Sequence, residues 1–456
     1  PSLMALGAIG DPDLAYRMGR ITAQEARAVG IHVPFAPVLD VNTNPDNPII
    51  NVRSLGEDPN QVALLGAALT RGIQVHGGIA TGKHFPGHGD TETDSHLDLP
   101  VIRVSRARMD SVELVPFRAA IEAGLGGMMT AHVAVPELNG GSERDPATLS
   151  SDVLTDLLRD ELDFDGLVFT DAMDMFAIDR RFSRAEAAVR AVEAGADVLL
   201  MVPDVEAAIV GLVEAVETGR ITEDRIDRSV LRLLRAKESL GLHEDREVDP
   251  RAVGRVVGIP ENEAAAREIA ERSITLLKND RDLLPLLGTR NARVLSVTYG
   301  SRTNFLQGRY FNRRLRATYA RLRTASLHRE SEESEYREIM TRAAGSQLVV
   351  VSTYVTVVSY SGTVALPEEL SEFIEELAAR RIPHVVVTVG NPYLIREFPN
   401  AQAYLLGWSD AAVSQRAAAD ALFGDRAILG RMPTAVPPLY GIGDGIQLPA
   451  KSTGGR

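Results

Sequence analysis

The sequence predicts an α/β protein in which an incomplete (β/α)8 TIM-type barrel is followed by a C-terminal α/β sandwich domain. Three observations lead to this fold class. Short apolar runs alternate with amphipathic stretches through the first half of the chain, each run ends in a polar residue, and a second alternation follows a turn-rich link. Strands and helices that alternate at this spacing are typical of right-handed crossovers and a parallel sheet.

The expected strands of the first domain are five apolar runs: Ile31–Val41, Ile79–Lys83, Gly127–Val133, Gly166–Asp171 and Asp197–Met201. The polar residues at or just after their ends are Asp40, Lys83 with His84, His132, Asp171, and Asp204. Parallel α/β proteins bind ligands at the carboxyl ends of their strands, so these residues are expected to line one site. A closed barrel has about eight strands, so the five expected here form only part of one.

The amphipathic stretches between these runs are the expected helices: Asn60–His76, Arg106–Ala123, Ser151–Leu162 and Ser183–Ala194. Two of them have recognisable ends. Ser151 is expected to cap the amino end of its helix. Gly195 is expected to end the helix that precedes it, because glycine readily adopts the backbone conformation found there.

The domains are expected to be residues 1–240 for the barrel, 241–260 for a linker and 261–456 for the sandwich. The expected strands of the second domain are Val294–Tyr299, Gln347–Tyr354, His384–Val389 and Ala403–Leu406. An amphipathic stretch, Leu366–Arg381, is the expected helix between two of them. The arginine-rich stretch Arg309–Arg323 is expected to be a solvated helix face rather than a binding patch.

Composition excludes several classes of function. The 49 Lys and Arg against 62 Asp and Glu give a net charge of −13, which argues against nucleic acid or an anionic membrane as the main partner. The chain has no cysteine, which excludes disulfides, thiolate metal sites and cysteine nucleophiles. No apolar run reaches the length of about 18 residues that a membrane-spanning helix needs.

Histidines cluster between residues 76 and 132, where five of the nine are found. The segment 82–96 is a loop rich in glycine, histidine and carboxylates, a composition typical of functional loops. One interpretation is a phosphate-binding P-loop, since Gly77, Gly82 and Lys83 fit its spacing. His84 replaces the required Ser or Thr, and Pro86 blocks the following helix, so this interpretation is disfavoured.

A second interpretation of the loop is a metal site. His84, His88, Asp90, Asp94 and His96 are all possible zinc or manganese ligands. Their spacing matches neither H-E-x-x-H nor a close pair of histidines, so the site is expected to hold no metal.

A third interpretation is an acid–base dyad. Asp94 and His96 lie two residues apart, so in an extended loop their side chains are on the same side. The carboxylate can orient the imidazole and stabilise its protonated form. Such a histidine can protonate a leaving group and later activate water. On spacing, a dyad and a loop that merely satisfies its own backbone are equally supported.

Asp171 ends an apolar strand and is a candidate nucleophile, because an ionised, partly buried carboxylate is unfavourable unless it is paired or used. The alternative is a helix N-cap, a role common at strand–helix junctions. Asp174 fits that role better, because it lies one helical turn further along.

Several motifs resemble those of glycoside hydrolase family 3, and more narrowly its bacterial β-N-acetylglucosaminidase branch. The most specific is Lys83-His84-Phe85-Pro86-Gly87-His88-Gly89 followed by Asp94-Ser95-His96. Further motifs in the same order are Ala36–Val41, Arg53–Gly56, Ala131–Val133 and Phe169–Met175, and Ser273–Leu286 is similar to the start of the family's second domain.

The resemblance implies a retaining hydrolase without a cofactor. It makes Asp171 the nucleophile that forms a glycosyl-enzyme, and His96 with Asp94 the acid and base. Lys83, His84 and Arg53 then match positions that hold sugar hydroxyls. The remaining candidates, Asp40 and His132, are expected to support the pocket.

The implied substrate is a terminal β-linked N-acetylglucosamine of peptidoglycan-derived or chitin-type oligosaccharides. A neutral base repels an anion less than a carboxylate does, so a phosphorylase is one alternative. A β-glucosidase of the same family is another, and a non-enzymatic sugar-binding protein is a third. The only expected partner is a carbohydrate. Oligomeric state and localisation, whether cytoplasmic, periplasmic or secreted, are left open.

One departure from the family concerns the first 30 residues. Members open with two strands before the one at 36–41, and the second carries an Asp-Gln-Glu-Gly-Gly type motif. Nothing in Pro1–Gly30 matches it. Since incomplete barrels expose sheet edges, this piece of the barrel is expected to be unstable or inactive by itself.

Overall fold

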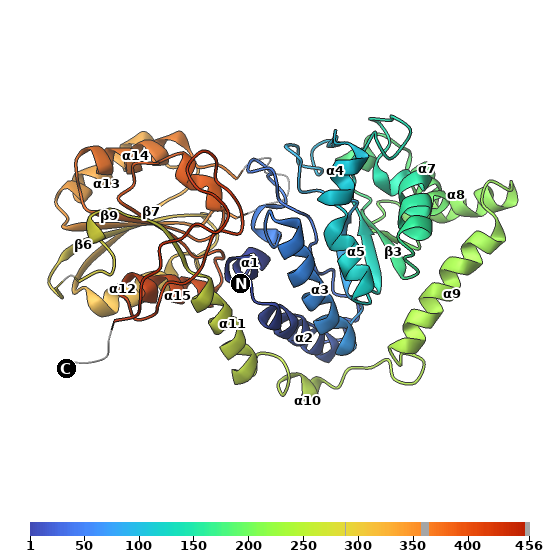
Figure 1. The fold of residues 1–456 in the computed structure, drawn as a ribbon, viewed down its shortest axis with the longest axis horizontal. Helices are drawn as coiled ribbons and strands as arrows, with labels where there is room; N and C mark the ends of the chain where they lie inside the picture. The colour runs from blue at the N-terminus through green and yellow to red at the C-terminus, as the bar shows by residue number, and fades with distance from the viewer. Residues whose placement is uncertain (288, 357–363, 452–456) are drawn as a thin grey trace. The chain divides into compact units, whose positions relative to one another are not determined.

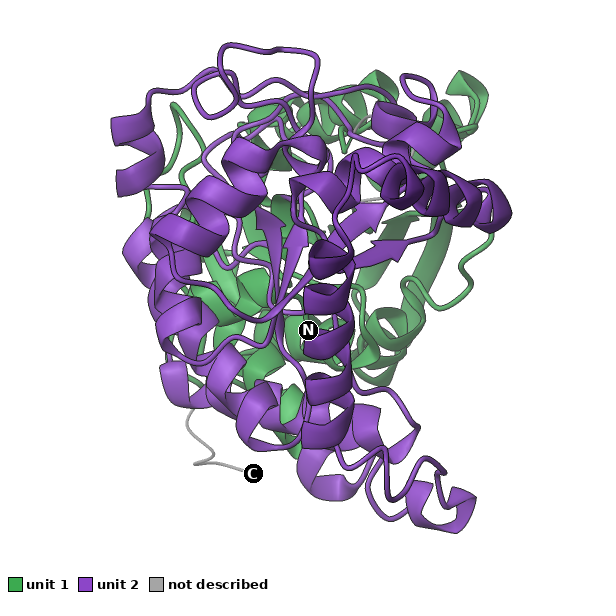
Figure 2. Cartoon of the chain, turned by 90° about the vertical axis from the view of Figure 1, so that its right-hand side faces the viewer, with its two compact units in different colours: residues 1–10, 51–53, 264–456 green, residues 11–50, 54–263 purple. Residues whose placement is uncertain are grey.

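The computed structural model describes residues 1–287, 289–356 and 364–451, and Figure 1 shows its helices and strands. The chain forms two compact units, coloured separately in Figure 2. One unit comprises residues 11–50 and 54–263, and the other comprises residues 1–10, 51–53 and 264–456. The predicted domain boundaries at 240 and 261 stay a prediction from the sequence.

A parallel four-stranded sheet forms the centre of the unit that begins at residue 11. Its strands, in the order β1-β2-β3-β4, are β1 (Thr81–Phe85), β2 (Gly127–Thr130), β3 (Leu167–Ala172) and β4 (Val198–Leu200). Four of the five expected strands therefore form, each within a few residues of its expected place. Such strands are built from short apolar runs because both faces of a parallel sheet are covered.

The prediction of a fifth strand at Ile31–Val41 is wrong, because this segment does not form a regular strand. Only one bridge forms there, between Val38 and Lys83, although the segment runs beside β1 and exchanges several backbone hydrogen bonds with it. Pro34 and Pro37 have no N–H group, so a continuous ladder of hydrogen bonds is impossible along this segment.

Helices surround this sheet, among them α3 (Pro59–Val75), α4 (Arg106–Ser111), α5 (Val115–Glu122) and α7 (Arg184–Ala194). The others are α2 (Pro12–Ala28), the π-helical segment η3 (Asp152–Glu161), α6 (Phe176–Asp179), α8 (Val205–Glu217), α9 (Glu223–Ser239) and α10 (Pro250–Val253). Two glycines let α2 and α3 touch. A Cβ atom on Gly19 would lie 2.4 Å from the Leu69 carbonyl oxygen, and one on Gly72 would lie 2.2 Å from that of Tyr16.

Three expectations about helix ends had different outcomes. The expected helix Arg106–Ala123 is divided into α4 and α5. The expected N-cap at Ser151 is wrong, because this residue has helical backbone angles and its side chain makes no capping bond. Gly195 does end α7, with a φ of 132°.

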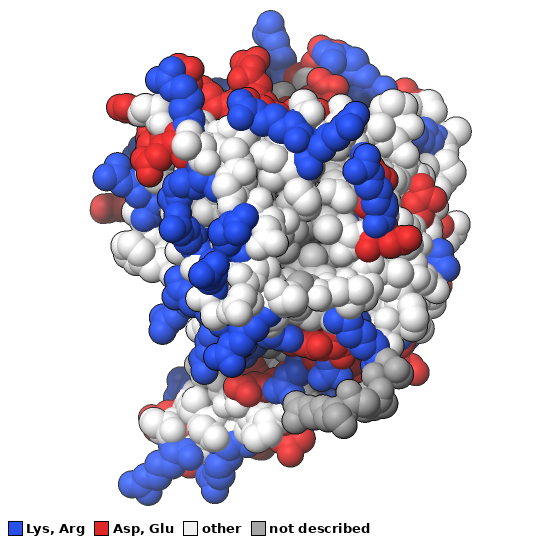
Figure 3. Space-filling view, turned by 90° about the vertical axis from the view of Figure 1, so that its left-hand side faces the viewer, with Lys and Arg blue, Asp and Glu red and all other residues white. Residues whose placement is uncertain are grey.

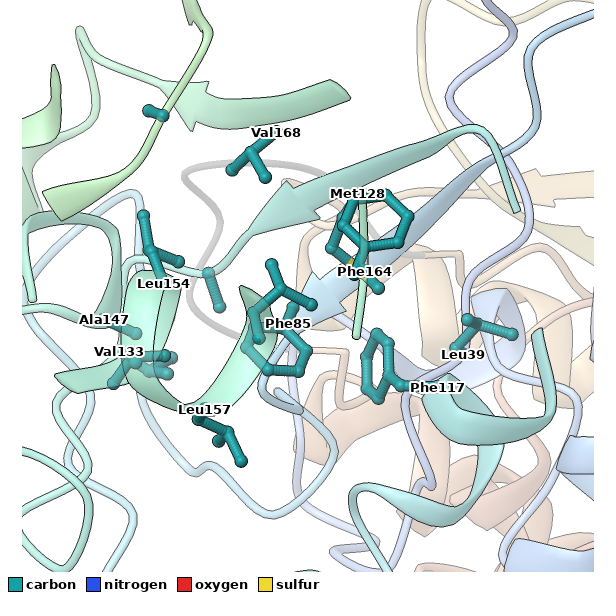
Figure 4. Packing of buried hydrophobic residues seen from close by; sticks show 14 of the residues in the cluster. Leu39, Phe85, Phe117, Met128, Val133, Ala147, Leu154, Leu157, Phe164 and Val168 are labelled. Carbon is teal, nitrogen blue, oxygen red and sulfur yellow. The ribbon is translucent and has the colours of Figure 1, made fainter. Parts of the chain in front are cut away.

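Apolar side chains from the sheet and the helices meet in one core (Figure 4). Phe85 of β1 contacts Phe117 of α5 edge to face, with ring centroids 5.4 Å apart. Met128 of β2 and Val168 of β3 are fully buried in the same cluster. This packing fixes the strands whose carboxyl ends carry the candidate site residues.

The other unit contains a six-stranded sheet with the order β5-β10-β9-β8-β6-β7. Its strands are β5 (Thr275–Asn279), β6 (Arg293–Tyr299), β7 (Arg321–Leu327), β8 (Leu348–Thr353), β9 (His384–Thr388) and β10 (Ala403–Leu406). All neighbours are parallel except β5, which is antiparallel to β10. The helices of this unit are α1 (Leu3–Ile9), α12 (Arg309–Thr318), α13 (Glu333–Ala344), α14 (Glu368–Ala379) and α15 (Ala412–Leu422). A further helix, α11 (Pro260–Ser273), leads from one unit to the other along the chain.

Four strands of this sheet were predicted, and β5 and β7 were not. The arginine-rich stretch 309–323 is only partly the expected helix, because α12 ends at Thr318 and β7 begins at Arg321. Alternating charged and apolar residues in Arg321-Leu322-Arg323 are typical of an edge strand, and β7 lies at the edge of the sheet.

Candidate active site

Asp40 holds the loop that follows β1. It is fully buried, and its carboxylate accepts hydrogen bonds from the backbone N–H of His88 at 2.7 Å and from that of His84 at 3.1 Å. The ring Nδ1 of His84 donates a third at 2.7 Å. Burial acts to raise the pKa of Asp40, but His84 and His88 together hold it below its ordinary value. A buried carboxylate with three donors therefore stays ionised and fixes the turn.

His88 is buried and links two parts of the loop. Its Nδ1 lies 2.9 Å from Thr91 Oγ1 and its Nε2 lies 3.1 Å from Ser95 Oγ. Burial, with repulsion from His84, lowers the pKa of His88 to about 4. The ring is therefore neutral near pH 7, and it positions Ser95 between the two members of the predicted dyad.

Asn47 supports the same loop from a segment far away in sequence. Its side-chain amide donates to the carbonyl oxygens of His88 and Gly89 at 2.9 and 3.1 Å and to Thr91 Oγ1 at 3.2 Å. Sequence reasoning missed Asn47 and treated His88 only as a possible metal ligand. The family-like motif around His88 could have indicated a role for that histidine. An isolated asparagine such as Asn47 gives no such indication.

Asp94 and His96 make direct contact. The His96 Nδ1 atom lies 2.8 Å from Asp94 Oδ1, and the His96 backbone N–H donates to the same oxygen at 2.9 Å. The Asp94 side chain is 1% exposed and that of His96 is 20% exposed. Because an ionised carboxylate only accepts, Nδ1 carries the proton and Nε2 is the atom that can exchange one with a substrate.

Asp171 lies near the end of β3, where its Oδ1 accepts the N–H of Ala172 at 2.8 Å. Burial acts to raise the pKa of this carboxyl. The opposing attraction of His84 and His132, with the Ala172 amide and Lys83, holds the pKa below its ordinary value. An ionised, weakly solvated carboxylate has the properties of a nucleophile.

His132 follows β2 and is fully buried. Its Nε2 lies 2.9 Å from the carbonyl oxygen of Ala172, and its Nδ1 lies 2.7 Å from Thr148 Oγ1. Burial lowers the pKa of His132, so the ring is neutral. A carbonyl only accepts, so Nε2 carries the proton.

Electrostatic contacts place these groups in one neighbourhood. The carboxylate of Asp171 interacts with His84, His132 and Lys83. His132 in turn interacts with both Asp171 and His96. The carboxyl ends of β1, β2 and β3 and the loop at 86–96 thus bring these residues together. Asp204, which was expected in the same site, instead caps α8, where its carboxylate accepts the Ala207 N–H at 2.9 Å. Arg53 lies in a short 3-10 helix, Asn51–Arg53, of the other compact unit, and its part in the site stays a prediction.

The second interpretation of the same loop was a metal site. Within the residues that the structure describes, no three His, Asp or Glu side chains are grouped closely enough to hold a metal ion. In the same part of the chain, no helix is long and apolar enough to cross a membrane.

Comparison with known proteins identifies the family. Residues 1–236 match the Glycosyl hydrolase family 3 N terminal domain, and residues 274–450 match the Glycosyl hydrolase family 3 C-terminal domain. The chain belongs to glycosyl hydrolase family 3. Its two compact units correspond to a barrel-like domain and a sheet domain of that family.

Three known proteins illustrate the likeness. A β-N-acetylglucosaminidase/β-glucosidase of Cellulomonas fimi is 38% identical over 301 residues, which are 64% of this chain and 53% of the relative. The structure of a β-N-acetylglucosaminidase from Paenibacillus sp. str. FPU-7 is 37% identical, with a TM-score of 0.84 over 96% of this chain and 82% of that one. The β-glucoside phosphorylase BglX is 25% identical, with a TM-score of 0.86 over 96% and 80% of the two chains.

The chain spans about half the length of the first curated relatives that it matches.

Proposed function

We propose that this protein is a retaining glycoside hydrolase that releases terminal β-linked N-acetylglucosamine from peptidoglycan-derived or chitin-type oligosaccharides. The observation that carries the proposal is the 2.8 Å contact between Asp94 and His96, in the electrostatic neighbourhood of an ionised Asp171. Relatives named β-N-acetylglucosaminidase and β-hexosaminidase support the choice of sugar.

In the first step, a carboxylate oxygen of Asp171 attacks the anomeric carbon, and the bond to the departing oxygen breaks. His96 gives the proton on Nε2 to that oxygen, so the aglycone leaves as a neutral alcohol. The ionised Asp94 keeps its hydrogen bond to Nδ1 of His96, and its charge stabilises the imidazolium form that supplies the proton. The product is a glycosyl-enzyme with the sugar on Asp171.

In the second step, the neutral His96 takes a proton from water, whose oxygen attacks the anomeric carbon. The bond to Asp171 breaks and the carboxylate is regenerated. The depressed pKa of Asp171 suits both steps, because a weakly basic carboxylate is ionised as a nucleophile and is also a good leaving group.

The surrounding residues have separate proposed roles. Lys83, His84 and Arg53 would hold sugar hydroxyls. Asp40 orients His84 by accepting a 2.7 Å hydrogen bond from Nδ1, so the Nε2 atom of that ring points away from Asp40. His132 would support the pocket by fixing the backbone that follows Asp171.

The decisive experiment compares p-nitrophenyl N-acetyl-β-glucosaminide with the corresponding β-glucoside as substrates. The N-acetylated substrate should have the higher kcat/KM, and Asp171→Ala and His96→Ala should each lose most of that activity. Azide should partly restore turnover in His96→Ala, because the good leaving group needs no acid and only the second step lacks its base. Unchanged turnover in Asp171→Ala would contradict the nucleophile assignment.

A phosphorylase is the second candidate, because the fold matches a β-glucoside phosphorylase over 96% of this chain and the proposed base is a neutral imidazole. Adding inorganic phosphate to the same assay separates the two. Formation of a sugar 1-phosphate in place of the free sugar would establish phosphorolysis, and its absence would leave water as the acceptor.

A further inference from the structure

The sheet of the unit that contains residues 264–456 reverses its winding between β6 and β8. These two strands are neighbours in the sheet. From β6 the chain continues through α12 to β7 on one side, whereas from β8 it continues through α14 to β9 on the other side. In open parallel sheets, ligands bind outside the carboxyl ends of the strands at such a switch point, because the two loops diverge and leave a crevice.

A cavity of about 670 Å³ lies at this switch point. Residues 299–303 at the end of β6, Arg329 and Glu330 after β7, and residues 354–356 after β8 line it. The volume is within the range of small-molecule sites, roughly 300–1,000 Å³. None of these residues belongs to the proposed active site, so the cavity needs a separate explanation.

Two exposed arginines at this cavity, Arg302 and Arg329, have no carboxylate partner within the described part of the chain. The nearest acidic residue in the lining, Glu330, instead lies 3.2 Å from the ring of His328. Figure 3 shows more basic than acidic surface on the side where β6 lies in Figure 1, although the whole chain has a charge of −13. Unpaired guanidinium groups at a cavity are suited to an anion with several oxygens, which they can contact in pairs.

Hydroxyl groups add possible donors beside the arginines. Ser301 and Thr303 line the cavity with their side-chain oxygens 3.1 Å apart. The first amides of α12 are not available, because the Tyr310 N–H already donates to Gln415 at 3.2 Å. Recognition of an anion would therefore depend on side chains of the loops and not on the helix end.

The remaining wall is apolar and aromatic. Val355, Leu366 and Pro367 line it together with Tyr354, which is 4% exposed. The Tyr354 hydroxyl lies near Ser352 and the backbone of Gly308, which do not line the cavity.

We propose that this cavity binds a small phosphorylated ligand. Arg302 and Arg329 hold its phosphate with help from Ser301 and Thr303. The sugar or base ring that carries the phosphate packs against Leu366 and Pro367. The proposal is independent of the glycosidase assignment, because no residue is shared between the two sites.

Isothermal titration calorimetry with the purified protein tests the proposal. The probes are inorganic phosphate, N-acetylglucosamine 6-phosphate and AMP, with N-acetylglucosamine and adenosine as unphosphorylated controls. At least one of the two ring phosphates should bind more tightly than inorganic phosphate, and adenosine should not bind. Any binding of N-acetylglucosamine at the proposed active site should be the same in the wild type and in Arg302→Gln/Arg329→Gln. Whether the sugar phosphate or AMP binds more tightly identifies the ring.

The double variant Arg302→Gln/Arg329→Gln should weaken that binding by at least about tenfold, the effect of losing one charge-assisted hydrogen bond. The matched control is Arg323→Gln, which removes an exposed arginine near the other end of β7 and should leave the affinity unchanged. Leu366→Ala should weaken the binding of a ring phosphate but not of inorganic phosphate, because only the ring contacts this wall. No binding of any phosphorylated probe, or equal binding by the double variant and the wild type with unchanged circular dichroism, would overturn the proposal.

Discussion

The Nε2 atom of His132 lies 2.9 Å from the carbonyl oxygen of Ala172, the residue that follows Asp171. This bond joins the loop after β2 to the end of β3. The Ala172 N–H donates to Asp171 Oδ1 at 2.8 Å, so Ala172 is held through both its N–H and its carbonyl group. A neutral histidine therefore orients the proposed nucleophile through the backbone, without adding a full charge beside it.

Replacing Asp171 by asparagine should abolish glycosidase activity. We expect kcat to fall by at least about 10³-fold, because the amide cannot form the glycosyl-enzyme. The control is Asp165→Asn near the other end of β3, where the carboxylate is 83% exposed and pairs with Arg232. Steady-state kinetics with the N-acetylated nitrophenyl substrate measure both. Comparable activity of the two variants would be incompatible with a nucleophilic Asp171.

Replacing Asp94 by asparagine should impair His96 without removing it. We expect kcat to fall about 10²- to 10⁴-fold, the usual contribution of general acid–base catalysis. The neutral amide no longer stabilises the imidazolium form that donates the proton. The control is Asp98→Asn, an exposed carboxylate that pairs with Arg181. An unchanged kcat in Asp94→Asn would show that the two side chains do not act as a dyad.

Removing the Asp40 carboxylate should destabilise the protein and raise KM. In Asp40→Ala, the N–H groups of His84 and His88 lose a buried acceptor. The free energy of unfolding should fall by about 3–5 kcal/mol, as when one partner of a buried pair is removed. Urea denaturation followed by circular dichroism measures this. Asp165→Ala, which breaks an exposed pair, should change it by less than about 1 kcal/mol.

Gly89 should not tolerate a side chain. A Cβ atom there would lie 1.8 Å from the backbone carbonyl oxygen of Val41, so the loop has to move. We expect Gly89→Ala to lose about 1–3 kcal/mol of stability, and activity with it. Gly254→Ala is the control, because nothing lies within 4 Å of its added Cβ and its φ is −67°. Equal melting temperatures for the two variants would show that the loop after β1 is not held against the segment at 41.

Stability should fall as the pH is lowered from about 6.5 toward 4. His88 has a pKa of about 4 in the folded protein and an ordinary value of 6.5 when unfolded. Between these values the unfolded chain binds the proton and the folded one does not, so protonation favours unfolding. The slope from this group approaches about 1.4 kcal/mol per pH unit. Urea denaturation at pH 7, 6 and 5 measures it, and His88→Asn should have the smaller slope.

Local sequence patterns were sufficient for the strands and for the chemical identities at the site. β1 to β4 and four strands of the second sheet were predicted because each is a short apolar run. The same patterns failed at Ile31–Val41, where prolines interrupt an apolar run, and at β5 and β7. β7 is an edge strand whose arginines were interpreted as part of a helix.

The sequence by itself determined the candidate groups: a carboxylate after an apolar strand, and an aspartate and a histidine two residues apart. Residue type and spacing left their roles open, and the resemblance to the family implied which of them act. Only the tertiary structure decided what each group does with its neighbours. Asn47, His88 and His132 acquire their partners from segments brought close by folding. Burial sets the charge state of the two histidines, because desolvation depends on what surrounds a side chain in three dimensions.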